Sequence, residues 1–81
     1  MINLEKKVKI NPLELMKKTK NFFGSGGQGL MIISENDCNI TFQGGGGHLS
    51  VTLKEDDQGF TRVQIESREW DYQAKKFLAG L

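Results

Sequence analysis

The chain has 81 residues, and its 11 lysine and arginine residues nearly balance 10 aspartate and glutamate residues, with one histidine and one cysteine. This length suits one domain, near the lower limit at which an apolar core stabilises a fold without metals or disulfides. The net charge of +1 gives no overall field that would attract nucleic acid or anionic lipid, and one cysteine excludes an intramolecular disulfide. We therefore predict a single domain over residues 1–81, without metal or cofactor, in a reducing cytoplasmic compartment.

The charges are distributed unevenly along the chain. Residues 1–20 hold six lysines and two glutamates, a net charge of +4, whereas residues 35–57 hold five acidic residues and one lysine, a net charge of −4. The two ends of one chain, or two copies of the chain, would attract each other, although a solvated charged surface also accounts for the pattern. No apolar stretch reaches the length of a signal-peptide core or a membrane span, so we predict no membrane contact.

The first predicted elements are a strand and a helix. Residues 2–10 are apolar at Ile2, Leu4, Val8 and Ile10, which is the alternation of a strand with one buried face; the lysine at position 6 is tolerated on an edge strand. Asn11-Pro12 then predicts a helix start, and the helix continues to about Phe23. Its apolar side contains Leu15, Met16, Thr19, Phe22 and Phe23, and Lys17, Lys18 and Lys20 point outward.

The segment from Gly24 to Gly29 fits the pattern G-x-G-x-x-G but follows a helix and precedes a strand, the reverse of a dinucleotide-binding loop. We interpret it as a helix C-cap with a connector. Residues 30–34 form a short strand that is apolar on both faces. Such a strand is covered on both sides or pairs at a subunit contact.

Three more strands are predicted over residues 38–43, 48–54 and 60–67. Their alternation places Cys38 on the side of Ile40 and Phe42, so we expect a buried, inert thiol. His48 lies on the polar side, where a solvated histidine is favoured over a catalytic or metal-binding one. The polar side as a whole contains Asn39, Thr41, Gln43, Ser50, Thr52, Arg62, Gln64 and Glu66.

Residues 67–81 complete the pattern as a helix. Its apolar stripe contains Trp70, Ala74, Phe77, Leu78 and Leu81, and Ser67 is the predicted cap. We therefore predict an α+β, two-layer fold in which an antiparallel meander of about five strands packs against two helices, in the order β-α-β-β-β-β-α.

The run of four glycines at Gly44, Gly45, Gly46 and Gly47 allows two interpretations. It lacks the lysine and the serine or threonine of a phosphate-binding loop, but its backbone amides alone would suffice for an anion-binding nest. A turn or sharp bend between two strands is the simpler explanation, and close approach of another backbone, a helix or a second subunit would account for the excess of glycines.

Taken together, the NPLEL helix entry, the meander through TFQGGGGHLSVTL, the strand FTRVQIES and the final helix EWDYQAKKFLAGL resemble the helix-grip proteins, the superfamily of START, polyketide-cyclase and plant-allergen-like domains. The resemblance covers residues 5–80 and implies a C-terminal helix across an antiparallel sheet with an apolar ligand between them. The residues that would contact this ligand are Phe42, Leu49, Trp70 and Phe77. On so short a chain these side chains would fill the core unless two subunits together enclose a space.

The sequence thus favours a non-enzymatic binding or self-association module, with a dimer preferred and a small apolar ligand as a further partner. The alternative is a nucleic-acid-associated module that uses Lys7, Lys9, Lys17, Lys18 and Lys20. An enzyme ranks third, because no acid-base pair or nucleophile with a base is evident along the chain.

Overall fold

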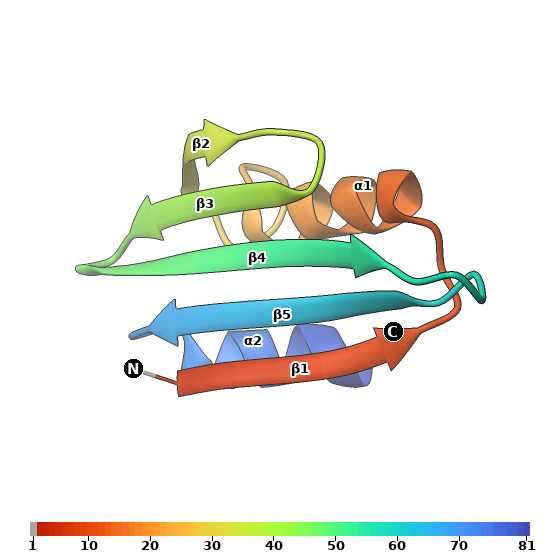
Figure 1. The fold of residues 1–81 in the computed structure, drawn as a ribbon. Helices are drawn as coiled ribbons and strands as arrows, with labels where there is room; N and C mark the ends of the chain where they lie inside the picture. The colour runs from red at the N-terminus through yellow and green to blue at the C-terminus, as the bar shows by residue number, and fades with distance from the viewer. Residues whose placement is uncertain (1) are drawn as a thin grey trace.

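The computed structural model describes residues 2–81 and has the predicted α+β fold, with its elements in the order β-α-β-β-β-β-α. All five strands belong to one antiparallel sheet, and both helices lie behind it in the view of Figure 1. The elements are β1 (Ile2–Val8), α1 (Pro12–Phe23), β2 (Met31–Glu35), β3 (Asn39–Gly44), β4 (Gly47–Glu55), β5 (Thr61–Arg68) and α2 (Asp71–Ala79).

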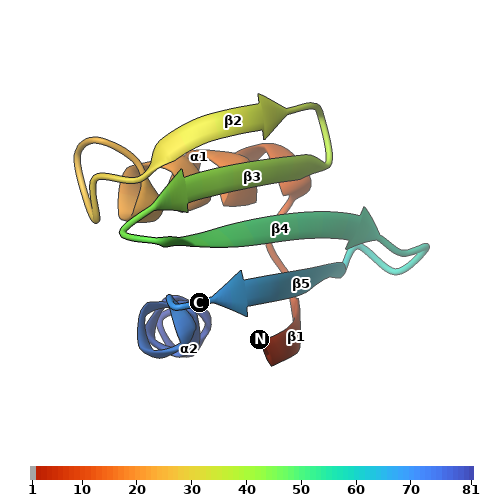
Figure 2. The same cartoon turned by 90° about the vertical axis from the view of Figure 1, so that its left-hand side faces the viewer.

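The strand order in the sheet is β1-β5-β4-β3-β2. Strands β2 to β5 are neighbours in sequence and in space, so they form the predicted meander, and β1 adds to its far side next to β5. Strands β1 and β2 are therefore the two edges, and α1 carries the chain from one edge to the other behind the sheet. Figure 2 shows the same layers from the side, with α2 viewed nearly end-on.

The ladder register separates an apolar side, which faces the helices, from a polar side, which we call the open face. Phe42 lies opposite Leu49, and Val51 lies opposite both Ile40 and Ile65, all on the side of the helices. Strands β3, β4 and β5 supply seven of the fifteen buried core residues from this side, namely Ile40, Phe42, Leu49, Val51, Leu53, Val63 and Ile65. The alternation read from the sequence is thus confirmed in β3, β4 and β5.

Helix α1 begins and ends as its sequence predicts. The side-chain oxygen of Asn11 accepts a hydrogen bond from the backbone N–H of Glu14 at 2.8 Å, and Pro12 occupies the first turn. At the other end, the N–H of Gly24 donates to the carbonyl of Lys20. The predicted apolar side is buried against the sheet at Leu15, Met16, Thr19 and Phe23, and Phe22 is half-buried.

Helix α2 begins later than predicted. Ser67, the predicted cap, lies inside β5 opposite Leu49, and Trp70 occupies the cap position, where its side chain makes no hydrogen bond to the first turn of the helix. The prediction was wrong because the alternation of β5 continues through Arg68, so the serine belongs to the sheet. The rest of the stripe is confirmed: Ala74, Phe77 and Leu78 are buried, and Trp70 and Leu81 pack against the core.

Lys6 has a structural role that explains its place on the apolar side of β1. Its ammonium nitrogen donates to the carbonyl oxygen of Leu78 at 2.8 Å, near the end of α2. The last carbonyls of a helix have no partner within the helix, and a positive charge is favourable there. The lysine therefore ties the C-terminal helix to the edge strand.

Candidate functional site

Of the four residues predicted to contact an apolar ligand, Phe42, Leu49 and Phe77 are buried in the core, and Trp70 is partly buried against it. Phe42 and Leu49 are fully buried neighbours on β3 and β4, and Phe77 is buried on α2. The ring centroid of Phe23 lies 5.7 Å from that of Phe42 and 5.2 Å from that of Phe77, so the aromatic side chains link the sheet to α2. These side chains pack against one another between the layers, and a ligand contact at this place stays a prediction.

The glycine run is a hairpin turn between β3 and β4. Gly45 and Gly46 have φ angles of 56° and 81°, and the flanking Gly44 and Gly47 pair across the ladder. Two positive φ angles in a two-residue loop are typical of a type I′ turn, which suits the twist of a hairpin. The turn therefore explains the two central glycines without a bound anion, and anion binding there stays a prediction.

The two outer glycines are required by close neighbours. A Cβ atom at Gly47 would overlap the carbonyl oxygen of Arg68, and one at Gly44 would come within 2.6 Å of the Leu30 side chain. Trp70 lies over the turn: its indole N–H donates to the Gly44 carbonyl at 2.9 Å, and its ring faces Gly45. Close approach of backbone and ring thus accounts for the excess of glycines.

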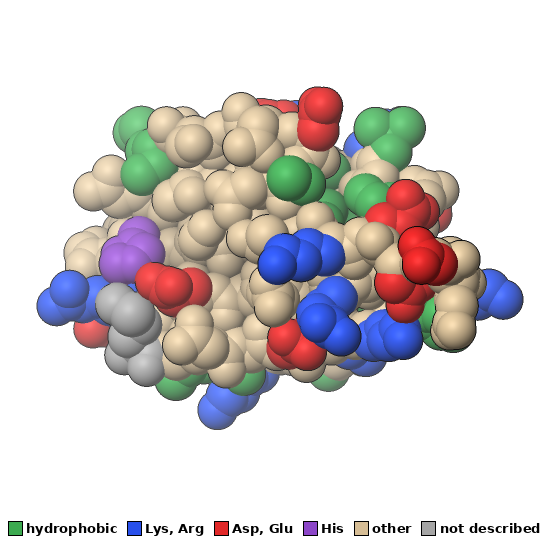
Figure 3. Space-filling view, in the orientation of Figure 1, with side chains coloured by type: hydrophobic (Ala, Val, Ile, Leu, Met, Phe, Trp, Pro, Cys, Tyr) green, Lys and Arg blue, Asp and Glu red, His purple; other side chains and the backbone are tan. Residues whose placement is uncertain are grey.

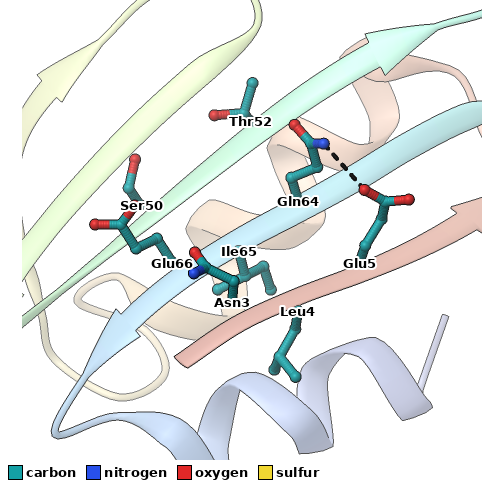
Figure 4. Close-up of a pocket in the computed structure, with 8 residues that line it drawn as sticks. All are labelled: Asn3, Leu4, Glu5, Ser50, Thr52, Gln64, Ile65 and Glu66. Atoms are coloured by element: carbon teal, nitrogen blue, oxygen red, sulfur yellow. Dashed lines mark hydrogen bonds between the residues drawn. The ribbon is translucent and has the colours of Figure 1, made fainter. Parts of the chain in front are cut away.

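The open face holds a shallow depression of about 490 Å³ that is lined by polar side chains of β1, β4 and β5 (Figure 4). Several of its polar groups already have hydrogen-bond partners on this face. Gln64 donates to the carboxylate of Glu5 at 3.0 Å, and the amide of Asn39 donates to the hydroxyl of Thr52 at 2.7 Å. This mutual bonding is typical of a solvated polar sheet face.

Most of the charged side chains of the open face gather on its right-hand half in Figure 3, toward the β4–β5 turn. Lys7 forms an ion pair with Asp56 at 3.1 Å and lies over the ring of Phe60. The backbone N–H of Gln58 is the main cause that lowers the pKa of Asp56, the N–H of Phe60 and the ammonium of Lys7 add to it, and desolvation opposes them. Asp56 therefore fixes the β4–β5 turn while it remains ionised.

The lysines predicted for nucleic-acid binding lie on two sides of the molecule. Lys17, Lys18 and Lys20 belong to α1, behind the sheet, whereas Lys7 lies on the open face opposite Arg62. Lys20 is also paired with Glu35 and Lys7 with Asp56. The five lysines therefore do not form one basic surface. Nucleic-acid binding stays a prediction.

The most unusual surface is the edge strand β2. All five of its residues are exposed, and Met31, Ile32 and Ile33 remain 68%, 41% and 52% accessible. In Figure 3 hydrophobic side chains appear along the border where β2 lies. Met31 lies opposite Gln43 and Ile32 opposite Phe42, so the strand is apolar toward both faces of the sheet. The two-faced apolar pattern agrees with the prediction, but β2 is not covered on both sides within its own chain, so the first predicted arrangement was wrong. Pairing at a subunit contact stays a prediction.

Leu13 is a further exposed apolar residue, near the Glu35 end of β2, and sequence reasoning missed it. Its side chain is 71% exposed on α1 and lines, with Glu35 and Asn36, a groove between α1 and the end of β2. Leu13 lies outside the apolar stripe of α1. A large apolar residue at such a position indicates an exposed apolar surface, and this signal was present in the sequence. We call Leu13, Met31, Ile32 and Ile33 the apolar edge.

The sequence-based predictions for the single cysteine and the single histidine had different outcomes. Cys38 is exposed, so the prediction of a buried thiol was wrong. Strand β3 begins at Asn39, and Cys38 lies in the preceding turn, where the alternation that predicted burial does not apply. His48 lies on the open face as predicted, opposite Gln43 and Arg68, and is half-buried.

No family model, curated protein or solved structure matches this chain. The helix-grip resemblance therefore stays a prediction. Within residues 2–81 no helix is long and apolar enough to cross a membrane, and no three His, Cys, Asp or Glu side chains are grouped so that they could hold a metal ion.

Proposed function

We propose that the protein is a self-associating module and that two copies pair through β2. The observation that carries the proposal is the apolar edge: three consecutive large apolar residues remain exposed on a strand that ends the sheet. An edge strand presents unpaired N–H and C=O groups, which a second strand satisfies by extending the sheet. An exposed apolar patch beside these groups favours such an addition.

The two edges of this sheet differ in a way that supports the proposal. Strand β1 carries Glu5, Lys6 and Lys7, the kind of charged residues that discourage pairing at an edge. Strand β2 has no lysine or proline, and its only charge, Glu35, is paired with Lys20 of α1. One edge is therefore protected against association, and the other is open to it.

The sequence of β2 suits antiparallel pairing with itself around Ile33. In that register Ile33 lies opposite its own copy, Ile32 opposite Ser34, and Met31 opposite Glu35, so the two glutamates stay apart. Like charges directly opposite each other in a ladder are destabilising, and this register avoids them. The ladder to β3 also skips Ile33 at a bulge, which leaves this residue without a partner in its own chain.

The association that we propose is weak and reversible. A strand of five residues with one leucine beside it offers less contact area than a permanent dimer interface. We therefore expect a monomer–dimer equilibrium with a dissociation constant in the micromolar to millimolar range. Such an interface has the two-fold symmetry that is most common among homo-oligomers.

Sedimentation equilibrium over a wide range of concentration tests the proposal. The wild-type protein is expected to shift from monomer to dimer, and Ile33→Lys is expected to weaken this by about tenfold or more, because a lysine on an edge strand opposes pairing. The matched control is Tyr72→Lys, which places the same charge at a large exposed residue of α2, outside the apolar edge. A monomer at every concentration, or equal weakening by both variants, would contradict the proposal.

A further inference from the structure

The outer surface of the helical layer contains a groove that is separate from the apolar edge. It lies between α1 and the C-terminal end of α2, has a volume of about 380 Å³, and is lined by Lys18, Asn21, Phe22, Lys76, Phe77, Gly80 and Leu81. This volume is near the lower end of the range for small-molecule sites. None of its residues belongs to β2, so ligand binding in this groove is independent of the proposed association.

The groove has an apolar floor. The rings of Phe22 and Phe77 come from different helices, and their centroids are 5.3 Å apart, so they close the space between α1 and α2. Phe22 and Leu81 are only half-buried, which leaves part of this apolar surface in contact with water. A ligand that covers it gains the free energy of removing apolar surface from water.

The groove also has a cationic rim. Lys18 lines it from α1 and Lys76 from α2, and both side chains are exposed. Among residues 2–81 the ion pairs within 4.0 Å involve Lys7, Lys20 and Arg62, so neither rim lysine is neutralised by a carboxylate. An apolar floor between two free ammonium groups is complementary to a ligand with an apolar chain and a negative head.

We propose that this groove binds a free straight-chain fatty acid. The alkyl chain lies along Phe22, Phe77 and Leu81, and the carboxylate accepts hydrogen bonds from Lys18 and Lys76. Hydrogen bonds between ammonium and carboxylate are stronger than those between neutral groups. The open shape of the groove leaves one side of the chain in water, which limits the affinity.

A titration of 15N-labelled protein with decanoate, followed by NMR, tests this proposal. Saturable shifts of the backbone amides of Asn21, Phe22, Gly80 and Leu81 are expected, with little change along β3 and β4. Decanol tests the need for the negative head, and butyrate tests the need for the chain. Both are expected to produce weaker shifts than decanoate at equal concentration.

Two adjacent lysines supply the matched variants. Lys76→Glu is expected to weaken decanoate binding by about three- to tenfold, because it turns the attraction of an exposed charge into repulsion. Lys75→Glu makes the same change of charge one residue away, outside the groove, and is expected to bind decanoate nearly as well as the wild type. Asn21→Trp, which fills the groove from the exposed surface of α1, is expected to abolish the shifts.

Three results would overturn the proposal. If decanol binds as well as decanoate, the lysines have no role in binding. If Lys76→Glu and Lys75→Glu weaken binding equally, binding depends on the net charge of the protein and not on the lysine at the rim of the groove. Shifts that centre on the apolar edge would place the ligand elsewhere. Circular dichroism of each variant, together with Lys18→Glu as a second rim substitution, separates loss of binding from loss of fold.

Discussion

At the scale of single residues, the β3–β4 turn distinguishes two needs for glycine. Gly46 has a φ of 81° but open space around a Cβ, whereas a Cβ at Gly47 would overlap the backbone of Arg68. Gly46→Ala is therefore expected to lower the free energy of unfolding by about 1 kcal/mol, through its left-handed backbone alone. Gly47→Ala is expected to lower it by about 2 kcal/mol or more, because β5 must move.

Urea denaturation of these two variants beside the wild type measures the difference. Gly46→Ala serves as the control, because it adds the same methyl group to the same turn. An equal loss of stability in both variants would show that β5 does not lie against the turn as the structure has it.

Among residues 2–81, Glu69 is the one residue other than glycine with a positive φ angle. It lies between β5 and α2 with a φ of 72°, a value that only glycine adopts without strain. Glu69→Gly is therefore expected to raise the free energy of unfolding by about 1 kcal/mol, after allowance for the greater freedom of glycine in the unfolded chain. Glu69→Ala retains the strain and is the control for loss of the side chain. The account fails if the glycine variant is no more stable than the alanine variant.

At the scale of elements, the β4–β5 turn gives a prediction about pH. The pKa of Asp56 lies below its ordinary value of 3.8, because backbone N–H groups and Lys7 stabilise its carboxylate in the folded state. A lowered pKa in the folded state contributes stability that is present above the ordinary value and is lost as pH falls through the folded value.

An NMR titration of the Asp56 carboxyl carbon is expected to show a midpoint below 3.8. In Asp56→Asn the contribution of this carboxylate to the pH dependence of stability is lost. The melting temperature of this variant should therefore fall less on acidification than that of the wild type, which thermal melts at several pH values measure. A midpoint at or above the ordinary value would mean that the turn is not held by this carboxylate.

Local sequence patterns predicted the elements well where one face is buried. Alternation located β3, β4 and β5 because burial of every second residue leaves a period of two in the sequence. The errors occurred at the ends of strands. Cys38 precedes β3, so the alternation of that strand does not determine whether Cys38 is buried. Ser67 pairs with Leu49 in the sheet, and this pairing outweighs its tendency to cap a helix.

At the scale of the whole molecule, the arrangement of the sheet decides which surfaces are open. The apolar character of residues 30–34 indicated a covered or paired strand, but the neighbours of that strand depend on where α1 returns to the sheet. This information is not contained in the local pattern. The position of β2 at an edge, with Leu13 beside it, becomes visible only when the order β1-β5-β4-β3-β2 is known.

The candidate sites illustrate the same limit. Phe42, Leu49 and Phe77 were correctly identified as large apolar residues between the layers, yet side chains from both helices and the sheet occupy that region. The groove between α1 and α2 depends on the approach of Phe22 to Phe77, two residues that lie 55 positions apart in the sequence. No spacing rule along the chain reveals such a meeting.

The most direct test of the central claim is an isotope-filtered NOE measurement on an equal mixture of 13C,15N-labelled and unlabelled protein. Pairing of β2 with its copy predicts intermolecular NOEs between the side chains of Ile33 in the two chains, and between Met31 and Glu35. These signals should decrease on dilution and disappear in Ile33→Lys. Intermolecular NOEs confined to another surface, or none at concentrations where sedimentation shows dimers, would contradict the account.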